Sequence, residues 1–220
     1  YGARVPDQHW LYGFGLGSVS TDGSQHHVHD PFFPFESSYL PGSIVPCPDP
    51  TRAVGMVYDT STFDRVIVTA LFGSSGNLVE LAGPPEHVQV SPDGGRVVYV
   101  HYDELSGTTL RGHPITGGAE ALLSPVLDFD YDPTIEGKKI FLVTSDGTRV
   151  VYRADSPGIG GVVFELSSVP IQGGTSVPLT QGINGSVTQF ALSPDGSRVV
   201  YIAERIGSQR CVVMSTATNR

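Results

Sequence analysis

The chain repeats one segment three times, and this repetition limits its fold more than any other feature. The three copies align without gaps over residues 89–100, 142–153 and 191–202, and in each of them an Asp-Gly pair precedes an arginine followed by Val-Val-Tyr. The arginines Arg96, Arg149 and Arg198 are spaced by 53 and 49 residues. Self-similarity at a fixed period indicates structural units that stack on one another.

Each copy predicts two strands joined by a tight turn. An apolar or alternating stretch leads to the Asp-Gly pair, and Arg-Val-Val-Tyr follows as the second strand. Aspartate accepts hydrogen bonds from turn amides, and glycine adopts the positive φ that other residues resist. We therefore expect the turns to be formed by Asp93, Gly94, Asp146, Gly147, Asp195 and Gly196.

Two further strands are predicted in most units. Third strands are expected at residues 108–115, 162–171 and 211–215, and short closing strands at 119–123 and 176–180. A fourth unit is predicted over residues 53–81, where Arg65-Val-Ile-Val matches Arg-Val-Val-Tyr. A period near 50 with four antiparallel strands is typical of a propeller blade, and no segment has sustained helical periodicity. The predicted fold is an all-β propeller of about four such blades, or part of a propeller.

The repeated Ser-Pro-Asp-Gly-x-Arg-Val-Val-Tyr unit resembles the repeat of TolB-type β-propellers, which are relatives of the WD repeats. The resemblance extends from about residue 85 to the C-terminus, with Ser145 in place of the proline. It implies that the turn joins the inner two strands of a blade, so that Asp93, Asp146 and Asp195 are structural. A periplasmic scaffold that binds a protein partner is one function that the resemblance implies.

Residues 1–52 lack the repeat, and we expect them to form an arm rich in proline and aromatic residues before the blades of residues 53–220. The aromatic side chains Phe32, Phe33 and Phe35 lie between prolines and predict a stiff apolar ribbon. We expect this ribbon to dock on the protein's own sheets, with a partner's groove as the alternative.

The last unit has no predicted outer strand, so its third strand has an edge that needs a partner. Candidate strands for this edge lie at residues 9–14 and 42–45. A strand from a neighbouring molecule is the alternative, and a head-to-tail exchange of this kind gives a polymer.

Charge and hydropathy exclude two classes of partner. The net charge is −9, and the only lysines are Lys138 and Lys139, so the chain lacks the basic surface that nucleic acid requires. No apolar run reaches the length of about 18 residues that a membrane-spanning helix needs, so we expect no membrane insertion.

The two cysteines are candidates for a disulfide. Cys47 precedes the first predicted strand and Cys211 lies in the last one, so an arm that closes onto the last blade brings them together. The alternative is two separate small buried side chains, and the absence of a Cys-x-x-Cys pair excludes a zinc site built on thiolates.

Acidic residues at alternate positions form the candidate metal site. In a strand, Asp128, Asp130 and Asp132 share one face and could bind Ca²⁺, although the pattern lacks the glycine and glutamate of an EF-hand. The alternative is a charged, solvent-facing edge. A second candidate combines His26, His27 and His29 with Asp22 or Asp30, and its alternative is a solvated or interface segment; no other cofactor is expected.

The sequence contains no Gly-x-Ser-x-Gly elbow and no diagnostic spacing of serine, histidine and aspartate. We therefore expect a non-enzymatic extracellular or periplasmic module, structural or binding in role, that associates with copies of itself through strand donation by a terminus. The alternatives are a periplasmic protein-binding scaffold and a fragment of a ligand-binding or hydrolytic propeller protein.

Overall fold

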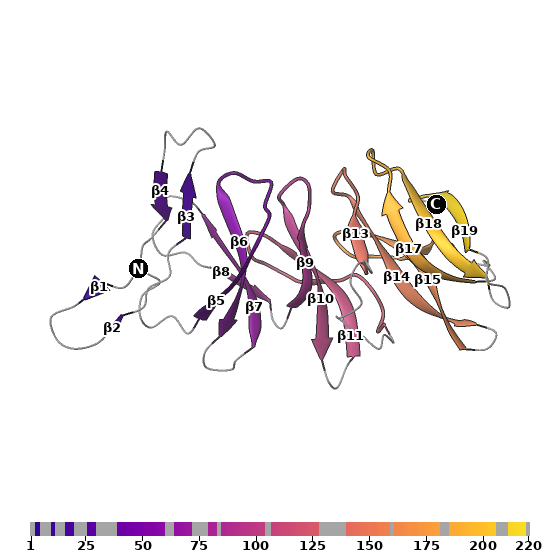
Figure 1. The fold of residues 1–220 in the computed structure, drawn as a ribbon, viewed down its shortest axis with the longest axis horizontal. Helices are drawn as coiled ribbons and strands as arrows, with labels where there is room; N and C mark the ends of the chain where they lie inside the picture. Colours follow the sequence, from indigo (N-terminus) through magenta and orange to yellow (C-terminus); the bar gives the residue numbers. More distant parts are fainter. Residues whose placement is uncertain are drawn as a thin grey trace. The chain divides into compact units, whose positions relative to one another are not determined.

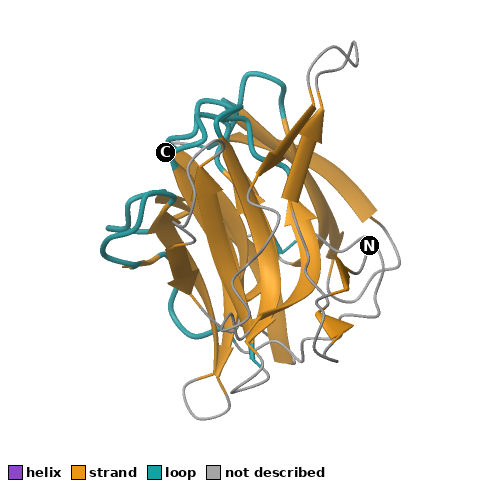
Figure 2. Cartoon of the chain, turned by 90° about the vertical axis from the view of Figure 1, so that its left-hand side faces the viewer, coloured by secondary structure: helices purple, strands orange, loops and turns teal. Residues whose placement is uncertain are grey.

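The computed structural model of the chain describes residues 3–4, 10–11, 16–19, 26–29, 39–59, 64–71, 79–82, 85–103, 107–127, 140–158, 161–180, 185–205 and 211–218. Every regular element in these ranges is a β-strand, as Figure 2 shows, so the prediction of an all-β fold is confirmed. No helix in these ranges is long and apolar enough to cross a membrane. The chain divides into two compact units, residues 1–85 and 86–220.

The first unit contains one four-stranded antiparallel sheet, sheet 1, with the order β5-β6-β7-β8 (Figure 1). Two two-stranded sheets, β1-β2 and β3-β4, precede it in the sequence. The strands of this unit are β1 (Ala3–Arg4), β2 (Trp10–Leu11), β3 (Leu16–Val19), β4 (His26–His29), β5 (Tyr39–Val45), β6 (Arg52–Asp59), β7 (Arg65–Leu71) and β8 (Val79–Ala82).

Strand β5 changes two expectations about the N-terminal region. It pairs with β6, so sheet 1 begins well before the boundary predicted at residue 52. The same pairing occupies residues 42–45, which the sequence suggested as a strand for the last sheet. A β-bulge between Pro41 and Ser43 accommodates Pro41 and Gly42 within the strand.

The second unit contains three sheets, which we number 2 to 4 in chain order. Sheets 2 and 3 have four antiparallel strands each, and sheet 4 has three in the described residues. Their strands are β9 (Pro85–Val90), β10 (Arg96–Asp103), β11 (Gly107–Pro114) and β12 (Ala121–Leu122); β13 (Phe141–Val143), β14 (Arg149–Gly158), β15 (Gly161–Pro170) and β16 (Val177–Pro178); and β17 (Gly185–Leu192), β18 (Arg198–Arg205) and β19 (Cys211–Ala217).

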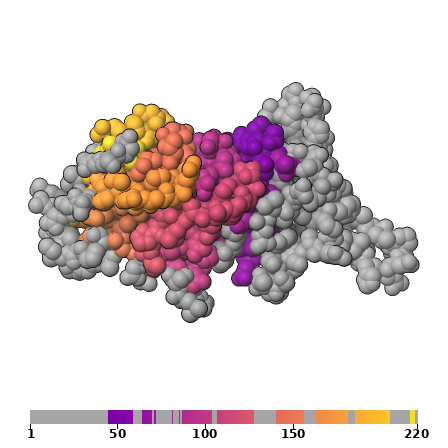
Figure 3. Space-filling model, turned by 180° about the vertical axis from the view of Figure 1, so that it is seen from behind, coloured from indigo at the N-terminus to yellow at the C-terminus, as the bar shows by residue number. Residues whose placement is uncertain are grey.

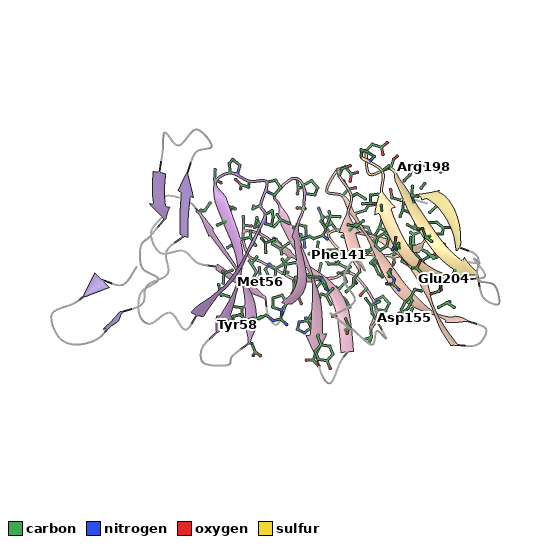
Figure 4. All side chains as sticks on the ribbon, viewed as in Figure 1. Met56, Tyr58, Phe141, Asp155, Arg198 and Glu204 are labelled. Carbon is green, nitrogen blue, oxygen red and sulfur yellow. The ribbon has the colours of Figure 1, made fainter. Side chains whose placement is uncertain are left out.

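Two apolar layers hold the sheets of the second unit together. Val98 and Val100 of sheet 2 pack in one cluster with Phe141 and Tyr152 of sheet 3, and Figure 4 shows Phe141 between these sheets. On the opposite face of sheet 3, Val151 packs in a second cluster, whose other members include residues of sheet 4. In Figure 3 the coloured residues of this unit, from magenta to yellow, form one continuous packed body.

Burial on both faces explains the Val-Val-Tyr repeat. Successive side chains of a strand point to opposite faces, so a strand between two neighbouring sheets needs apolar residues at consecutive positions. In β14, Val150 and Val151 are both fully buried although they face different neighbours. The repeat therefore encodes stacking of sheets rather than a single buried face.

The repeat in sheet 1 lies elsewhere than predicted. Strands β10, β14 and β18 are the second strands of their sheets, and the second strand of sheet 1 is β6, not β7. The match of Arg65-Val-Ile-Val to Arg-Val-Val-Tyr is therefore wrong, and Arg52 is the counterpart of Arg96. Cys47-Pro-Asp-Pro-Thr-Arg52 corresponds to Ser91-Pro-Asp-Gly-Gly-Arg96, and the cysteine and the second proline disguise the similarity.

Candidate functional site

The three Asp-Gly turns have the same pattern of hydrogen bonds. In sheet 4, Ser193 Oγ donates to Asp195 Oδ1 (2.5 Å) and accepts from the Arg198 N–H (3.0 Å), and the Ser197 N–H donates to the same carboxylate oxygen (3.1 Å). The same three bonds are made in the other two turns, by Ser91, Asp93, Gly95 and Arg96 in sheet 2 and by Thr144, Asp146, Thr148 and Arg149 in sheet 3. Gly94, Gly147 and Gly196 all have φ near 70°.

These bonds determine the electrostatics of the turn carboxylates. Hydrogen bonds from the neighbouring hydroxyl and amide groups lower the pKa of Asp93 and Asp146, and they lower the pKa of Asp195 to about 2. Each carboxylate is therefore ionised and bound within its own loop. We expect these residues to maintain the hairpin and not to act on a ligand.

Acid should weaken these turns. A carboxylate whose pKa is lower in the folded chain than in the unfolded chain adds stability above the unfolded pKa, which is 3.8 for Asp195, and this stability is lost as the pH falls toward about 2. In urea titrations, Asp195→Asn should be less stable than the natural chain near neutral pH, and the difference should shrink in acid. A difference that is the same at both pH values would contradict this assignment.

The turns of neighbouring sheets contact one another. A Cβ atom added at Gly147 would lie 3.3 Å from Asp93 Cγ, in the turn of sheet 2. A Cβ atom added at Gly196 would lie 2.7 Å from Ser145 Oγ and 2.9 Å from the Ser145 backbone nitrogen, in the turn of sheet 3. Glycine is thus required in the turn both for its φ and for its small size.

The arginine and tyrosine of the repeat join strands within a sheet. Arg149 donates from Nε to Ser168 Oγ (2.8 Å) and from Nη2 to the Ser168 carbonyl (3.1 Å), which ties β14 to β15. The Tyr152 hydroxyl hydrogen-bonds to Ser176 Oγ (2.8 Å), just before β16. In sheet 2, the Tyr99 hydroxyl donates in the same way to the Glu120 carboxylate, just before β12.

The short fourth strands are held by a Leu-Ser or Leu-Thr pair. The Leu123 N–H donates to the Leu110 carbonyl, and the Leu110 N–H donates to Ser124 Oγ, both at 2.8 Å. Sheet 3 repeats this arrangement at the same distances with Leu179, Leu166 and Thr180. Leu123 and Leu179 are buried, so the fourth strand contributes an apolar side chain as well as hydrogen bonds.

Removing one of these hydroxyls should leave a buried amide without its acceptor. We expect Ser124→Ala to lower the free energy of unfolding by about 1 to 3 kcal/mol, because Leu110 is fully buried. Thr116→Ala, in an exposed turn, should change it by no more than about 0.5 kcal/mol. Equal effects of the two substitutions in denaturant titrations would show that the Ser124 hydrogen bond adds nothing.

Strand β19 has no partner on its outer edge among the described residues, whereas the third strand of each of sheets 1 to 3 is followed by a fourth. The register of β19 with β18 shows which of its residues corresponds to Leu110 and Leu166. Val100 pairs with Leu110, Arg153 with Leu166, and Ile202 with Val213. By this equivalence the Val213 N–H and C=O point away from β18. We call the outer side of β19 the open edge.

The face of sheet 4 next to the open edge is also exposed. Val200 is 42% exposed, whereas its counterparts Val98 and Val151 are fully buried. The exposed charged residues Arg198 and Glu204 lie near opposite ends of the same strand, as Figure 4 shows. Sheet 4 thus combines an edge that can accept a strand with an apolar face beside it.

Cys47 does not form the predicted disulfide. It is a free, half-buried cysteine at the position that Ser91, Thr144 and Ser193 occupy in the other turns, and burial raises the pKa of its thiol. The adjacent turn is intact, since the Thr51 N–H donates to Asp49 Oδ1 (2.8 Å). Cys47 therefore takes the place of a turn hydroxyl, and the structure does not support its pairing with Cys211.

The other predicted sites lie largely outside the described residues. This holds for Asp128, Asp130 and Asp132, and for Phe32, Phe33 and Phe35, so the calcium site and the docking ribbon stay predictions. His26, His27 and His29 lie in β4, of which only the backbone is described. Within the described residues, no three His, Cys, Asp or Glu side chains are placed to hold a metal ion.

Two polar clusters in the second unit were not identified from the sequence. In sheet 2, Arg111 forms an ion pair with Glu120 (2.8 Å). In sheet 3, the buried Arg153 guanidinium lies 4.2 Å from the centre of the Phe164 ring. Arg111 lies outside the repeated segments and Arg153 ends one of them, but the repeat indicates no partner for either side chain, so only the spatial pairing reveals these contacts.

Comparison with solved structures establishes the architecture. No family model matches the chain, and no curated protein matches it in sequence. The crystal structure of TolB from Acinetobacter baumannii is similar over 93% of this chain, with a TM-score of 0.50 and 16% identity. The fold is that of a partial β-propeller. The chain spans about half the length of that TolB protein, 46% of its chain.

The structure of a prolyl endopeptidase is also similar to that of this chain. It has a TM-score of 0.52 and 16% identity, and the match covers 84% of this chain and 29% of that one. At this level of identity the likeness concerns the fold alone, and a propeller fold supports many unrelated functions. Function must therefore be argued from the residues of this chain.

Proposed function

We propose that this chain is a non-enzymatic propeller scaffold that binds protein through the open edge of β19, and that its partner is another copy of the chain. The observation that carries the proposal is the difference between sheet 4, with three described strands, and sheets 1 to 3, with four each. An edge with unpaired N–H and C=O groups is a template for an added strand.

Association between copies has to come from strand pairing and apolar burial. Only 16% of the residues are charged, but the net charge of −9 repels a second copy, so charge does not favour the contact. The apolar face at Val200 lies beside the open edge and gains burial when a strand is added there. We place the protein outside the cytoplasm, in the extracellular space or the periplasm, because the repeat that it resembles belongs to periplasmic proteins.

A proline at the open edge tests the proposal. Val213→Pro removes an N–H that points outward, and proline is tolerated on the free side of an edge strand. In light scattering at increasing concentration, the natural chain should grow in mass, and Val213→Pro should remain monomeric.

A matched control is available on another edge. Leu122→Pro places proline at the outer edge of sheet 2, where sheet 3 already has Pro178, and it should leave the association unchanged. Circular dichroism should show that both variants keep their strands. A natural chain that is monomeric at every concentration, or equal association of Val213→Pro, would overturn the proposal.

The absence of enzymatic activity is a separate part of the proposal. The polar residues that recur in the units are bound within turns or join strands, which leaves them structural roles. The purified chain should not hydrolyse peptide or ester substrates above the buffer rate. Hydrolysis that is lost on substitution of one residue would favour the alternative of a fragment of a hydrolytic propeller protein.

A further inference from the structure

We infer that the open edge of β19 selects an extended peptide in which a leucine is followed by serine or threonine. The inference rests on the proposed function, since it specifies the segment that the same edge accepts. The other sheets of the chain already bind segments of this kind at the equivalent edge. Their contacts therefore describe the missing ligand of sheet 4.

Register fixes the positions that would hold the peptide. Val213 is the counterpart of Leu110 and Leu166, because each of them pairs with the residue four places after the arginine of the repeat. Leu110 and Leu166 each accept a hydrogen bond from a leucine N–H and donate one to a hydroxyl. The Val213 backbone offers the same donor and acceptor to an incoming strand.

The leucine has a defined place on sheet 4. Leu123 belongs to the apolar cluster of Val98, and Leu179 belongs to that of Val151. The counterpart of these valines in sheet 4 is Val200, which is exposed. A docked leucine would therefore lie on the face that carries Val200 and shield it from water, which gives the peptide an apolar anchor besides its backbone bonds.

The fourth strands of sheets 1 to 3 show which of the two peptide residues, the leucine or the hydroxyl residue after it, matters more. Leucine is present in all of them, as Leu81, Leu123 and Leu179, and each is buried. The hydroxyl is present in two, as Ser124 and Thr180, whereas the residue that follows Leu81 in sheet 1 is Ala82. We expect the leucine to be essential for binding and the hydroxyl to strengthen it.

A labelled peptide with the sequence of residues 173–181 tests the inference on the full-length chain. Fluorescence anisotropy should show saturable binding of this peptide. Replacing the leucine of this peptide, which corresponds to Leu179, with aspartate should weaken binding by about a hundredfold, and replacing the threonine that follows it, which corresponds to Thr180, with valine should weaken it by about tenfold. The variant Val213→Pro should bind poorly, whereas Leu122→Pro should bind like the natural chain.

The outcomes separate this inference from the proposed function. Self-association with no peptide binding would overturn the inference and leave the proposed function standing. Peptide binding by a chain that stays monomeric would overturn the proposed function and leave the inference standing. Binding of the aspartate peptide as tightly as the natural one would also overturn the inference, because it would show that the edge accepts any extended chain.

Discussion

Replacing Val151 with lysine is expected to unfold sheets 2 to 4, whereas the same replacement of Val200 should leave them almost as stable as before. The two valines occupy the same position of the repeat, but Val151 is fully buried and Val200 is 42% exposed. A lysine at position 151 would bury a charge with no partner at a packed interface between sheets. We expect a loss of about 4 kcal/mol or more in the free energy of unfolding for Val151→Lys, and a change of no more than about 0.5 kcal/mol for Val200→Lys.

Urea unfolding followed by far-ultraviolet circular dichroism measures both variants. Val98→Lys is a second test of whether burial decides the effect of the lysine. Val98 is also fully buried, so this variant should behave like Val151→Lys. A large loss for Val200→Lys would show that this face of sheet 4 is covered within the chain, and it would remove the apolar surface on which the peptide site depends.

Gly196→Ala is expected to destabilise the chain by about 3 kcal/mol, roughly twice the effect of Gly147→Ala. Both glycines have φ near 70°, so each substitution places an L-residue in the left-handed region at a cost of about 1 to 2 kcal/mol. At Gly147 the new Cβ meets the end of the Asp93 side chain at 3.3 Å, which can move. At Gly196 it meets the Ser145 backbone nitrogen at 2.9 Å, so the turns of sheets 3 and 4 must separate.

Thermal and urea unfolding of the two alanine variants gives the comparison. A further variant, Ser145→Gly with Gly196→Ala, removes the hydroxyl but keeps the backbone contact, and it should recover only part of the loss. Full recovery would show that the side chain alone causes the clash, and equal effects of Gly147→Ala and Gly196→Ala would show that the turns do not press on each other.

The sequence predicted the repeated sheets because their signals are local and strong. An Asp-Gly turn followed by Arg-Val-Val-Tyr combines a conformational requirement with an apolar run, and three copies confirm the period. The same reasoning predicts no outer strand for the last unit, and sheet 4 has three strands among the described residues. These features depend on residues that are neighbours in the chain.

Other features could not be predicted because they depend on spatial neighbours. The first turn was missed since Cys47 and Pro50 replace the usual serine and glycine, although the geometry at Asp49 is kept. Short closing strands were predicted at residues 119–123 and 176–180, where β12 and β16 lie, but the hydrogen bonds of Ser124 and Thr180 that hold these strands form across the sheet and have no signal in the local sequence. The candidate strand at residues 42–45 is part of β5, but its pairing with β6 rather than with the last sheet depends on the spatial arrangement of the strands.

The contact between successive turns has a consequence for how such an array can arise. Each repeat of sheets 3 and 4 presents a glycine to the turn before it, and the turns of sheets 2 and 3 present Asp93 and Ser145 to the one after. A single stretch of some fifty residues therefore carries both contact groups, the glycine that meets the preceding turn and the residue that the following turn meets. Tandem duplication of that stretch would lengthen the protein without any compensating change elsewhere in the gene.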